Sequence, residues 1–309
     1  MRVAVVGAGA VGGYFGSQFL RAGFDVDFYA RGKHLEALRR HGLVLLEGGK
    51  KTLFKVKAYD KPPKDAVADL ILFTVKGYNT DSALKKYRSV ASPSSIVLSL
   101  QNGFGNREKI ANKWGHPERI VPAMTRIGVE VTHPGTITYS GLGIIYFGAE
   151  TPKQKKAAET IKQILEAAEI SFSFERDIRR ILWRKFMWNV AFNTVSAVTE
   201  STMGEMLSDP AVRRLLEDVT KEAAAVGRAE GVKITDADVL GVVGPRPKFS
   251  AFRTSMLQDY LAGKPLETET LSGALIRKAR ARKISAPKTE ALHAILTHKT
   301  ALRKGSSSR

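Results

Sequence analysis

The chain has 309 residues, enough for two domains, and its hydrophobic share of 43% is ordinary for a globular protein. It contains no cysteine, which excludes disulfides and thiolate metal or redox sites. The formal net charge is +19, but Lys and Arg are spread along the chain among acidic residues and form no nucleic-acid-binding motif. Since no apolar run approaches the roughly 20 residues of a membrane span and no signal peptide precedes the first strand, we expect a cytoplasmic protein that binds neither membranes nor nucleic acids.

A short apolar run leads directly into a glycine-rich turn at the start of the chain. Residues 3–6 predict a buried strand, and an apolar-periodic helix follows the turn and ends at Gly23. The turn comprises Gly7, Ala8, Gly9, Ala10, Val11 and Gly12. In such a strand–turn–helix unit the glycines permit a tight turn, close approach of a pyrophosphate, and close packing of the helix on its strand. The pattern predicts a dinucleotide site, and the alternative is a glycine turn without a ligand.

The end of the second strand indicates which dinucleotide binds. Residues 25–31 alternate between two faces and end in Ala30-Arg31, where NAD-dependent enzymes usually carry Asp or Glu. A carboxylate at this point would repel a 2′-phosphate, whereas an arginine can bind it through charge-assisted hydrogen bonds. Arg31 therefore favours NADPH over NADH, and the alternative is a solvated basic loop.

Alternating strands and helices continue through the first half of the chain, which is typical of a doubly wound parallel sheet. Two buried central strands, at 69–75 and 94–100, end next to Lys76 and Asn102. The carboxyl ends of such strands line the ligand crevice, so both residues are site candidates, although each could simply begin a turn. The other expected elements are a helix at 35–41, strands at 43–47, 53–56, 120–131, 136–147 and 170–174, and a helix at 153–168.

Helical patterns dominate beyond residue 177. The expected helices are 178–201, 210–230, 247–262, 267–283 and 287–300. We therefore predict an α/β fold, with an N-terminal Rossmann-type doubly wound sheet over 1–175 and an all-α domain over 176–303. Residues 304–309 are expected to form a disordered tail.

One polar stripe interrupts an otherwise apolar helix. Lys185, Asn189 and Asn193 are spaced at i, i+4 and i+8, and their neighbours are mostly large and apolar. Asparagine forms helices poorly and is costly to bury, so two on one face need a reason. One hypothesis is a lysine acid with amides that orient a substrate carboxylate and hydroxyl, and the other is a buried structural hydrogen-bond network. Ser255 and Glu267, farther along the chain, indicate no function by themselves.

The combined motifs resemble the ketopantoate reductase (2-dehydropantoate 2-reductase) family over nearly the whole chain. The motifs are the glycine turn, Thr74-Val-Lys76, Gln101-Asn102-Gly103, Leu182-Trp-Arg-Lys185 with Asn189 and Asn193, and Ser255-Met-Leu-Gln-Asp259 with Glu267. The resemblance implies NADPH-dependent reduction of ketopantoate, a small 2-keto acid, to pantoate in pantothenate and coenzyme A biosynthesis.

The resemblance also implies residue roles. Lys185 would be the proton donor, and the substrate would be held by Asn102, Asn189, Asn193 and Ser255. NADP(H) would be bound by the glycine turn, Arg31, Lys76, Asn102 and Glu267. Thr194 stands where the family often has proline, and the glutamate motif reads Glu267-Thr-Glu269 in place of Glu-Ile-Asp. These departures bear on the identity of the substrate and not on the fold.

Two other functions stay open at this point. One is a reductase of the same fold that acts on another 2-keto acid. The other is a non-catalytic regulator that senses NADPH or binds nucleic acid, which the Lys185 stripe disfavours because a sensor needs no proton donor. The sequence leaves the oligomeric state open, with a homodimer among the options.

Overall fold

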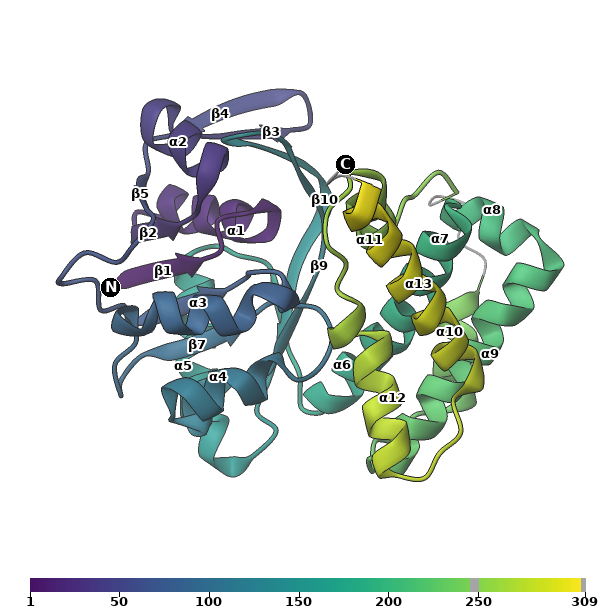
Figure 1. Ribbon diagram of the computed structural model, residues 1–309. Coiled ribbons are helices and arrows are strands. Elements are labelled where there is room, and N and C mark those ends of the chain that lie inside the picture. Colours follow the sequence, from purple (N-terminus) through teal and green to yellow (C-terminus); the bar gives the residue numbers. More distant parts are fainter. Residues whose placement is uncertain (245–249, 307–309) are drawn as a thin grey trace. The chain divides into compact units, whose positions relative to one another are not determined.

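The structure is a computed structural model that describes residues 1–244 and 250–306. The chain divides into two compact units. The first unit comprises Met1–Gln101 and Asn106–Ile178, and the second, called here the helical unit, comprises Asn102–Gly105 and the chain from Arg179 onward. In Figure 1 the strands lie in the purple-to-teal part of the chain, and the green-to-yellow part is helical.

A parallel six-stranded sheet forms the centre of the first unit. Its strands follow the order β5-β2-β1-β6-β7-β8, which places the first strand in the middle and confirms the predicted Rossmann-type doubly wound fold. The strands are β1 (Arg2–Val6), β2 (Asp25–Tyr29), β5 (Lys57–Tyr59), β6 (Leu70–Phe73), β7 (Ile96–Ser99) and β8 (Ile120–Val121).

Helices cover both faces of this sheet (Figure 1). One apolar core includes residues of α1 (Ala10–Arg21), α2 (Gly32–His41) and α5 (Lys155–Ala167). Another, on the opposite face, includes residues of α3 (Thr80–Lys86) and α4 (Asn106–Trp114). Strand β2 contributes to both cores: Val26 and Phe28 enter the first core, and Tyr29 enters the second. The side chains of residues 25–31 therefore alternate, as predicted, between two faces of the sheet that are both buried.

A second sheet, which the sequence analysis did not separate from the first, packs against the other side of α1. Its strands run in the order β11-β10-β3-β4, and β9 pairs with β10. An added Cβ at Gly16 would collide with the Phe28 ring of the parallel sheet, and one at Gly13 would collide with Ile137 of the second sheet. These glycines let α1 pack closely between the two sheets. The strands are β3 (Leu43–Glu47), β4 (Lys50–Phe54), β9 (Ala123–His133), β10 (Thr136–Phe147) and β11 (Phe172–Phe174).

The helical unit encloses a separate apolar core, in which Phe192, Leu216, Leu275 and Leu296 are fully buried. Its helices are α6 (Ile178–Trp188), a π-helical turn (Asn189–Asn193), α7 (Thr194–Thr199), α8 (Met203–Ser208), α9 (Pro210–Ala229), α10 (Asp236–Val243), α11 (Ser255–Leu261), α12 (Ser272–Ala281) and α13 (Pro287–Ser306). Short 3₁₀ turns across the chain are Gly77–Asn79, Arg88–Val90, Pro117–Arg119, Pro152–Gln154 and Thr268–Thr270.

Several of the expected helices were wrong in their bounds. The helix expected over 178–201 is interrupted by the π turn, and the one over 267–283 is a 3₁₀ turn followed by α12. The helix expected over 247–262 begins only at Ser255, because Thr254 caps it, and residues 247–249 lie outside the described residues. The tail expected at 304–309 overlaps the end of α13, and its residues 307–309 are not described.

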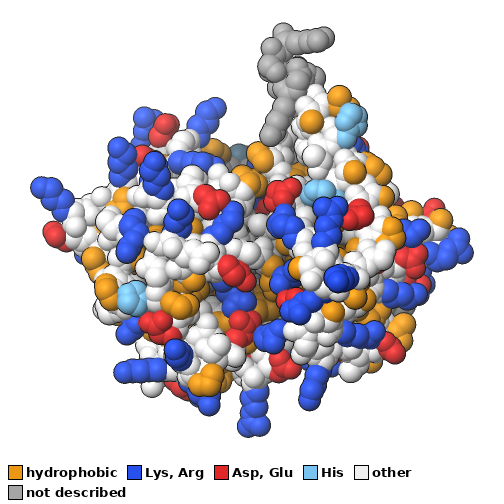
Figure 2. All heavy atoms as spheres, turned by 60° about the horizontal axis from the view of Figure 1, so that its bottom comes forward, with side chains coloured by type: hydrophobic (Ala, Val, Ile, Leu, Met, Phe, Trp, Pro, Cys, Tyr) orange, Lys and Arg blue, Asp and Glu red, His pale blue; other side chains and the backbone are white. Residues whose placement is uncertain are grey.

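The positive charge of the chain is largely interspersed with acidic side chains, as the face in Figure 2 shows. The densest basic stretch, 277–283, is an example. Arg277 pairs with Glu269 at 2.9 Å and Arg280 with Glu290 at 3.0 Å, while Lys278 and Arg282 share Glu230. In the described part of the chain, no helix is both long and apolar enough to cross a bilayer.

Candidate functional site

The glycine turn has the close packing that the sequence predicts. Gly7 adopts a φ of +102°, and a Cβ there would lie 2.7 Å from the Val75 nitrogen. A Cβ at Gly12 would collide with the Gly7 carbonyl and the Thr74 hydroxyl. Gly9 differs, because an added Cβ would meet no atom within 4 Å. Gly7 and Gly12 therefore serve the fold, and the turn leaves space beside Gly9.

Backbone hydrogen bonds fix the shape of this turn. The Tyr29 carbonyl accepts from the Gly7 and Ala8 N–H groups at 3.1 and 2.9 Å. The Thr74 hydroxyl donates to the Gly7 carbonyl at 2.7 Å. Helix α1 then begins at Ala10 without a side-chain cap, so its first N–H groups have no intrahelical acceptor and can bind an anion. The turn can hold the pyrophosphate of a dinucleotide.

Arg31 and Lys76 both follow strands that neighbour β1. Arg31 is exposed at the N-cap position of α2, two residues after the Tyr29 carbonyl that holds the glycine turn. Lys76 is half-buried just beyond β6. The Gln101 amide donates to the Val75 carbonyl at 2.8 Å, which ties the loop after β7 to the loop after β6. The first unit thus gathers the predicted cofactor residues Gly7 to Gly12, Arg31 and Lys76 at the carboxyl edge of its parallel sheet.

The Lys185 stripe runs from α6 through the π turn. In a regular α-helix, positions eight residues apart diverge by about 80°, so a straight stripe would be lost. The π turn spans Asn189–Asn193, and its wider winding removes most of this divergence. Lys185, Asn189 and Asn193 therefore stay on one face. The π turn was not predicted, because a uniform helical period was expected over these residues.

The two asparagines are buried at 4% and 1% exposure, and Lys185 is half-buried. The Asn193 Oδ1 atom has no hydrogen-bond partner, as one of two such buried side-chain atoms in the part of the chain that the structure describes. A buried unsatisfied carbonyl costs about 1–3 kcal/mol, and a purely structural network would pair it. The unpaired oxygen therefore favours the hypothesis that Asn193 accepts a hydrogen bond from a bound ligand.

Ser255 is brought to this region by a capping residue. The Thr254 hydroxyl accepts from the Leu257 N–H at 3.2 Å and hydrogen-bonds the Ser196 hydroxyl at 2.6 Å. This contact fixes the start of α11 to α7, and α11 also packs against the π turn. Ser255, the first residue of α11, is exposed beside that junction. The contact between Thr254 and Ser196 was not predicted from the sequence, although threonine before a helix is a common capping signal.

Asn102 belongs to the helical unit, although it follows β7 of the first unit. Its neighbour Phe104 donates its N–H to the Thr270 carbonyl at 3.0 Å, and the Phe104 ring packs 4.4 Å from that of Phe186. Glu267, 7% exposed, begins the short turn that leads to Thr270. The helical unit therefore holds all of the remaining predicted site residues: Asn102, Lys185, Asn189, Asn193, Ser255 and Glu267.

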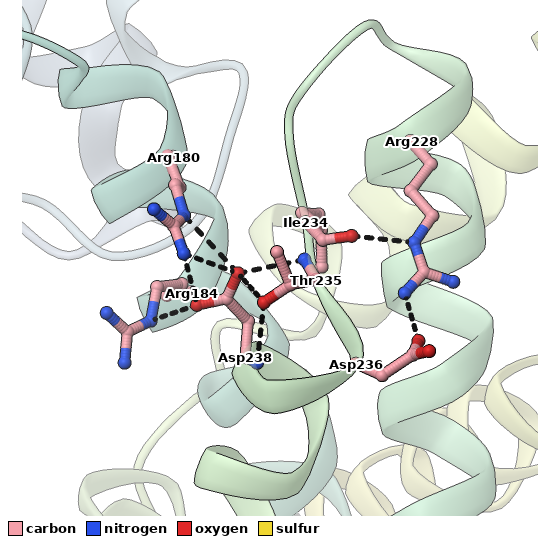
Figure 3. Close-up of polar contacts among 7 residues, drawn as sticks. All are labelled: Arg180, Arg184, Arg228, Ile234, Thr235, Asp236 and Asp238. Carbon is pink, nitrogen blue, oxygen red and sulfur yellow. Dashed lines mark hydrogen bonds and ion pairs between the residues drawn. The ribbon is translucent and has the colours of Figure 1, made fainter.

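A buried carboxylate fixes helix α6, which carries Lys185 (Figure 3). Asp238 is 4% exposed and binds Arg180 at 2.9 Å and Arg184 at 3.1 Å, both on α6. It also accepts from the Thr235 N–H and hydroxyl in the capping box of α10. Burial alone would raise the pKa of Asp238, but the hydrogen bonds from Thr235 and the Arg180 pair outweigh it and hold this pKa below its usual value.

We expect Asp238→Ala to lower the free energy of unfolding by about 2 kcal/mol, because it removes several charge-assisted hydrogen bonds while the arginines stay partly solvated. Asp236→Ala is the matched control: Asp236 also pairs with an arginine, Arg228, but its side chain is 91% exposed. The control should leave stability unchanged. Urea unfolding measures both variants, and equal losses would contradict the anchoring role of Asp238.

Comparisons with known proteins identify the same family in both halves of the chain. A model of the family described as ketopantoate reductase PanE/ApbA matches residues 3–152, and a model of the C terminal of that family matches residues 177–300. A 2-dehydropantoate 2-reductase from Pyrococcus horikoshii is 30% identical over 306 residues, which cover 99% of this chain and 100% of that protein.

Two solved structures are similar over nearly the full length. A PanE/ApbA family ketopantoate reductase from Ralstonia eutropha has a TM-score of 0.90 and 31% identity, with 98% of this chain and 100% of that chain covered. A ternary structure of D-mandelate dehydrogenase with NADH and anilino(oxo)acetate has a TM-score of 0.92 at 21% identity, covering 98% and 99%. At that identity the second likeness concerns the fold alone.

Proposed function

The chain belongs to the ketopantoate reductase family of oxidoreductases, and from this premise we propose that it reduces 2-dehydropantoate to pantoate with NADPH. Pantoate would then enter pantothenate and coenzyme A biosynthesis. The observation that carries the proposal is the aligned face of Lys185, Asn189 and Asn193, with its buried carbonyl oxygen that lacks a partner. Such a face suits a substrate that has both an oxygen to protonate and a hydroxyl to donate.

The chemistry assigned to this chain follows from the residue types. NADPH, bound at the glycine turn, supplies the hydride that reduces the C2 ketone of the substrate. The Lys185 ammonium stabilises the negative charge that develops on the ketone oxygen and gives its proton to that oxygen, which yields the alcohol. The amides of Asn189 and Asn193 hold the substrate, with the Asn193 Oδ1 atom accepting from its hydroxyl. Ser255 holds the substrate together with these amides, and Asn102 closes the site from the side of the cofactor.

The other two functions have less support. A reductase of a 2-keto acid without a hydroxyl group would keep the lysine but would leave the buried Asn193 acceptor without a donor. A nucleic-acid-binding regulator would have no use for a proton donor at Lys185, and the densest basic stretch, 277–283, is largely paired with acids. The direct test is loss of NADPH absorbance on addition of 2-dehydropantoate. If the protein does not reduce this substrate but reduces a different 2-keto acid, then that acid is its substrate and the proposal is wrong.

Arg31 should set the choice of nicotinamide cofactor. We expect Arg31→Ala to raise the KM for NADPH about tenfold, because the 2′-phosphate loses a charge-assisted hydrogen bond, and to leave the KM for NADH nearly unchanged. Arg40→Ala, an exposed arginine at the other end of α2, is the control and should change neither value. Equal losses with both cofactors would show that Arg31 acts on the fold and not on the 2′-phosphate.

A further inference from the structure

One histidine joins the glycine turn to the second sheet. His34 lies in the first turn of α2, and its Nε2 atom is 2.7 Å from the Ala8 carbonyl oxygen. Its Nδ1 atom accepts from the Gly135 N–H at 3.1 Å, in the turn between β9 and β10. The Gly135 carbonyl in turn accepts from the Val44 N–H of β3 at 2.9 Å. The ring therefore connects three segments that are far apart in the sequence.

These two partners determine the protonation state of the ring. A carbonyl oxygen only accepts, so Nε2 must carry a hydrogen, and a backbone N–H only donates, so Nδ1 must carry none. His34 is thus neutral, in its Nε2–H tautomer. A proton added to Nδ1 would face the Gly135 N–H donor to donor and would break that contact.

The charge around His34 also disfavours protonation. Burial is the main cause that lowers the pKa of His34 below 6.5, against a smaller opposing effect of the Ala8 hydrogen bond. The positive end of α2 acts in the same direction. Charged or titratable side chains on the elements around His34 include Arg31, Lys33, Glu36, Arg39, Arg40 and His41 along α2 and its N-cap and His133 before the β9–β10 turn, all exposed, and the half-buried Glu47 of β3. The glycine turn itself has none.

Ala8 matters because it lies inside the glycine turn. Its N–H already donates to the Tyr29 carbonyl at 2.9 Å, so His34 fixes the remaining polar group of this residue. The next residue is Gly9, where the turn leaves space, and α1 begins one residue later. A shift of the Ala8 carbonyl would therefore move the N–H groups at the start of α1 that would bind a pyrophosphate.

We propose that His34 is a positioning residue for the cofactor: its neutral imidazole holds the glycine turn in the shape that binds NADPH, and its protonation weakens that binding. The proposal rests on the cofactor assignment of the proposed function. Because the neutral ring is the form that holds the turn, NADPH binding should weaken at low pH. Above about pH 6.5 the ring is neutral in the folded and unfolded chain, and its hydrogen bonds to Ala8 and Gly135 are intact. As the pH falls below this value, the unfolded chain takes up the proton first, so stability decreases until the lower folded-state pKa of His34 is reached. NADPH affinity decreases at still lower pH, as the folded, ligand-free protein takes up the proton at His34.

The test is an NADPH fluorescence titration of the full-length protein at about pH 7.5 and about pH 5.5. His34→Gln keeps a donor for the Ala8 carbonyl but cannot titrate, and His41→Gln removes an exposed histidine of the same helix as a control. The wild type and the control should lose more affinity on acidification than His34→Gln, by up to about tenfold, since one ordinary hydrogen bond carries at most that factor and the lowered pKa keeps part of the ring neutral. The 2′-phosphate titrates in all three proteins alike, so the difference isolates His34.

A second measurement does not depend on the ligand. Nitrogen chemical shifts of the imidazole in the ligand-free wild type should show the Nε2–H tautomer and resistance to protonation. An Nδ1–H tautomer, or the same pH dependence of NADPH affinity in His34→Gln and wild type, would overturn the inference. Failure of the wild type to bind NADPH at about pH 7.5, with the tautomer as expected, would instead refute the cofactor assignment.

Discussion

Lys185→Ala should lower the turnover number with 2-dehydropantoate by about 10²- to 10⁴-fold, the usual contribution of a general acid. The reaction needs a proton at the ketone oxygen as the hydride arrives, and without the ammonium that proton must come from water. The side chain is half-buried on a helix whose anchors are Arg180, Arg184 and Asp238, so the fold should survive its loss. Single-turnover and steady-state rates with NADPH measure the effect.

Two companion variants make this result specific. A small primary amine added to the solution should restore part of the activity of Lys185→Ala, because the truncation leaves room for it. Lys185→Met fills that space with an uncharged chain and should gain nothing from the amine. Thermal unfolding of each variant should match the wild type. A folded Lys185→Ala protein with nearly normal turnover would remove the lysine from the mechanism and restore the hypothesis of a structural network.

Asn193→Leu should preserve or improve stability while it damages function. The buried Oδ1 atom of Asn193 has no partner, so an apolar side chain of similar size removes an unsatisfied carbonyl, and the melting temperature should stay the same or rise by about a few degrees. The same change removes the acceptor for the substrate hydroxyl. We expect kcat/KM for 2-dehydropantoate to fall about tenfold to a hundredfold, with NADPH affinity unchanged.

Thr220→Val is the matched control for this trade-off. Thr220 is fully buried in the same unit, but its hydroxyl donates to the Leu216 carbonyl at 2.7 Å. Its loss should cost about 1 kcal/mol of stability and leave kcat/KM unchanged. If Asn193→Leu instead destabilises the protein as Thr220→Val does and keeps full activity, then the Asn193 amide serves the fold and not the substrate.

The sequence predicts the first unit well because its signals are local. A strand, a glycine turn and an apolar helix are adjacent, and Gly7 and Gly12 meet the steric demands that the motif implies. The second sheet was not separable, since pairing of β10 with β3 and β11 joins segments distant in the chain. His34 gave no signal for the same reason: its role depends on Ala8 and Gly135, which only the fold brings together.

Prediction of the helical unit was less complete. The i, i+4, i+8 spacing found Lys185, Asn189 and Asn193, but a uniform helical period cannot reveal the π turn that keeps them on one face. Helices α8 and α10 were missed although Thr202 with Glu205, and Thr235 with Asp238, form capping boxes that the sequence displays. The contact of Thr254 with Ser196 spans 58 residues and has no local signal.

A comparison of substrates decides whether this chain is a reductase for 2-dehydropantoate. The kcat/KM values for 2-dehydropantoate, 2-ketoisovalerate and phenylglyoxylate should be measured with saturating NADPH. 2-Ketoisovalerate lacks the hydroxymethyl group, so the buried Asn193 oxygen would be left without a donor. We expect 2-dehydropantoate to be preferred by at least about a hundredfold, since a site that hydrogen-bonds a substrate hydroxyl rejects the analogue without it. Equal or faster reduction of either other acid would contradict the assignment.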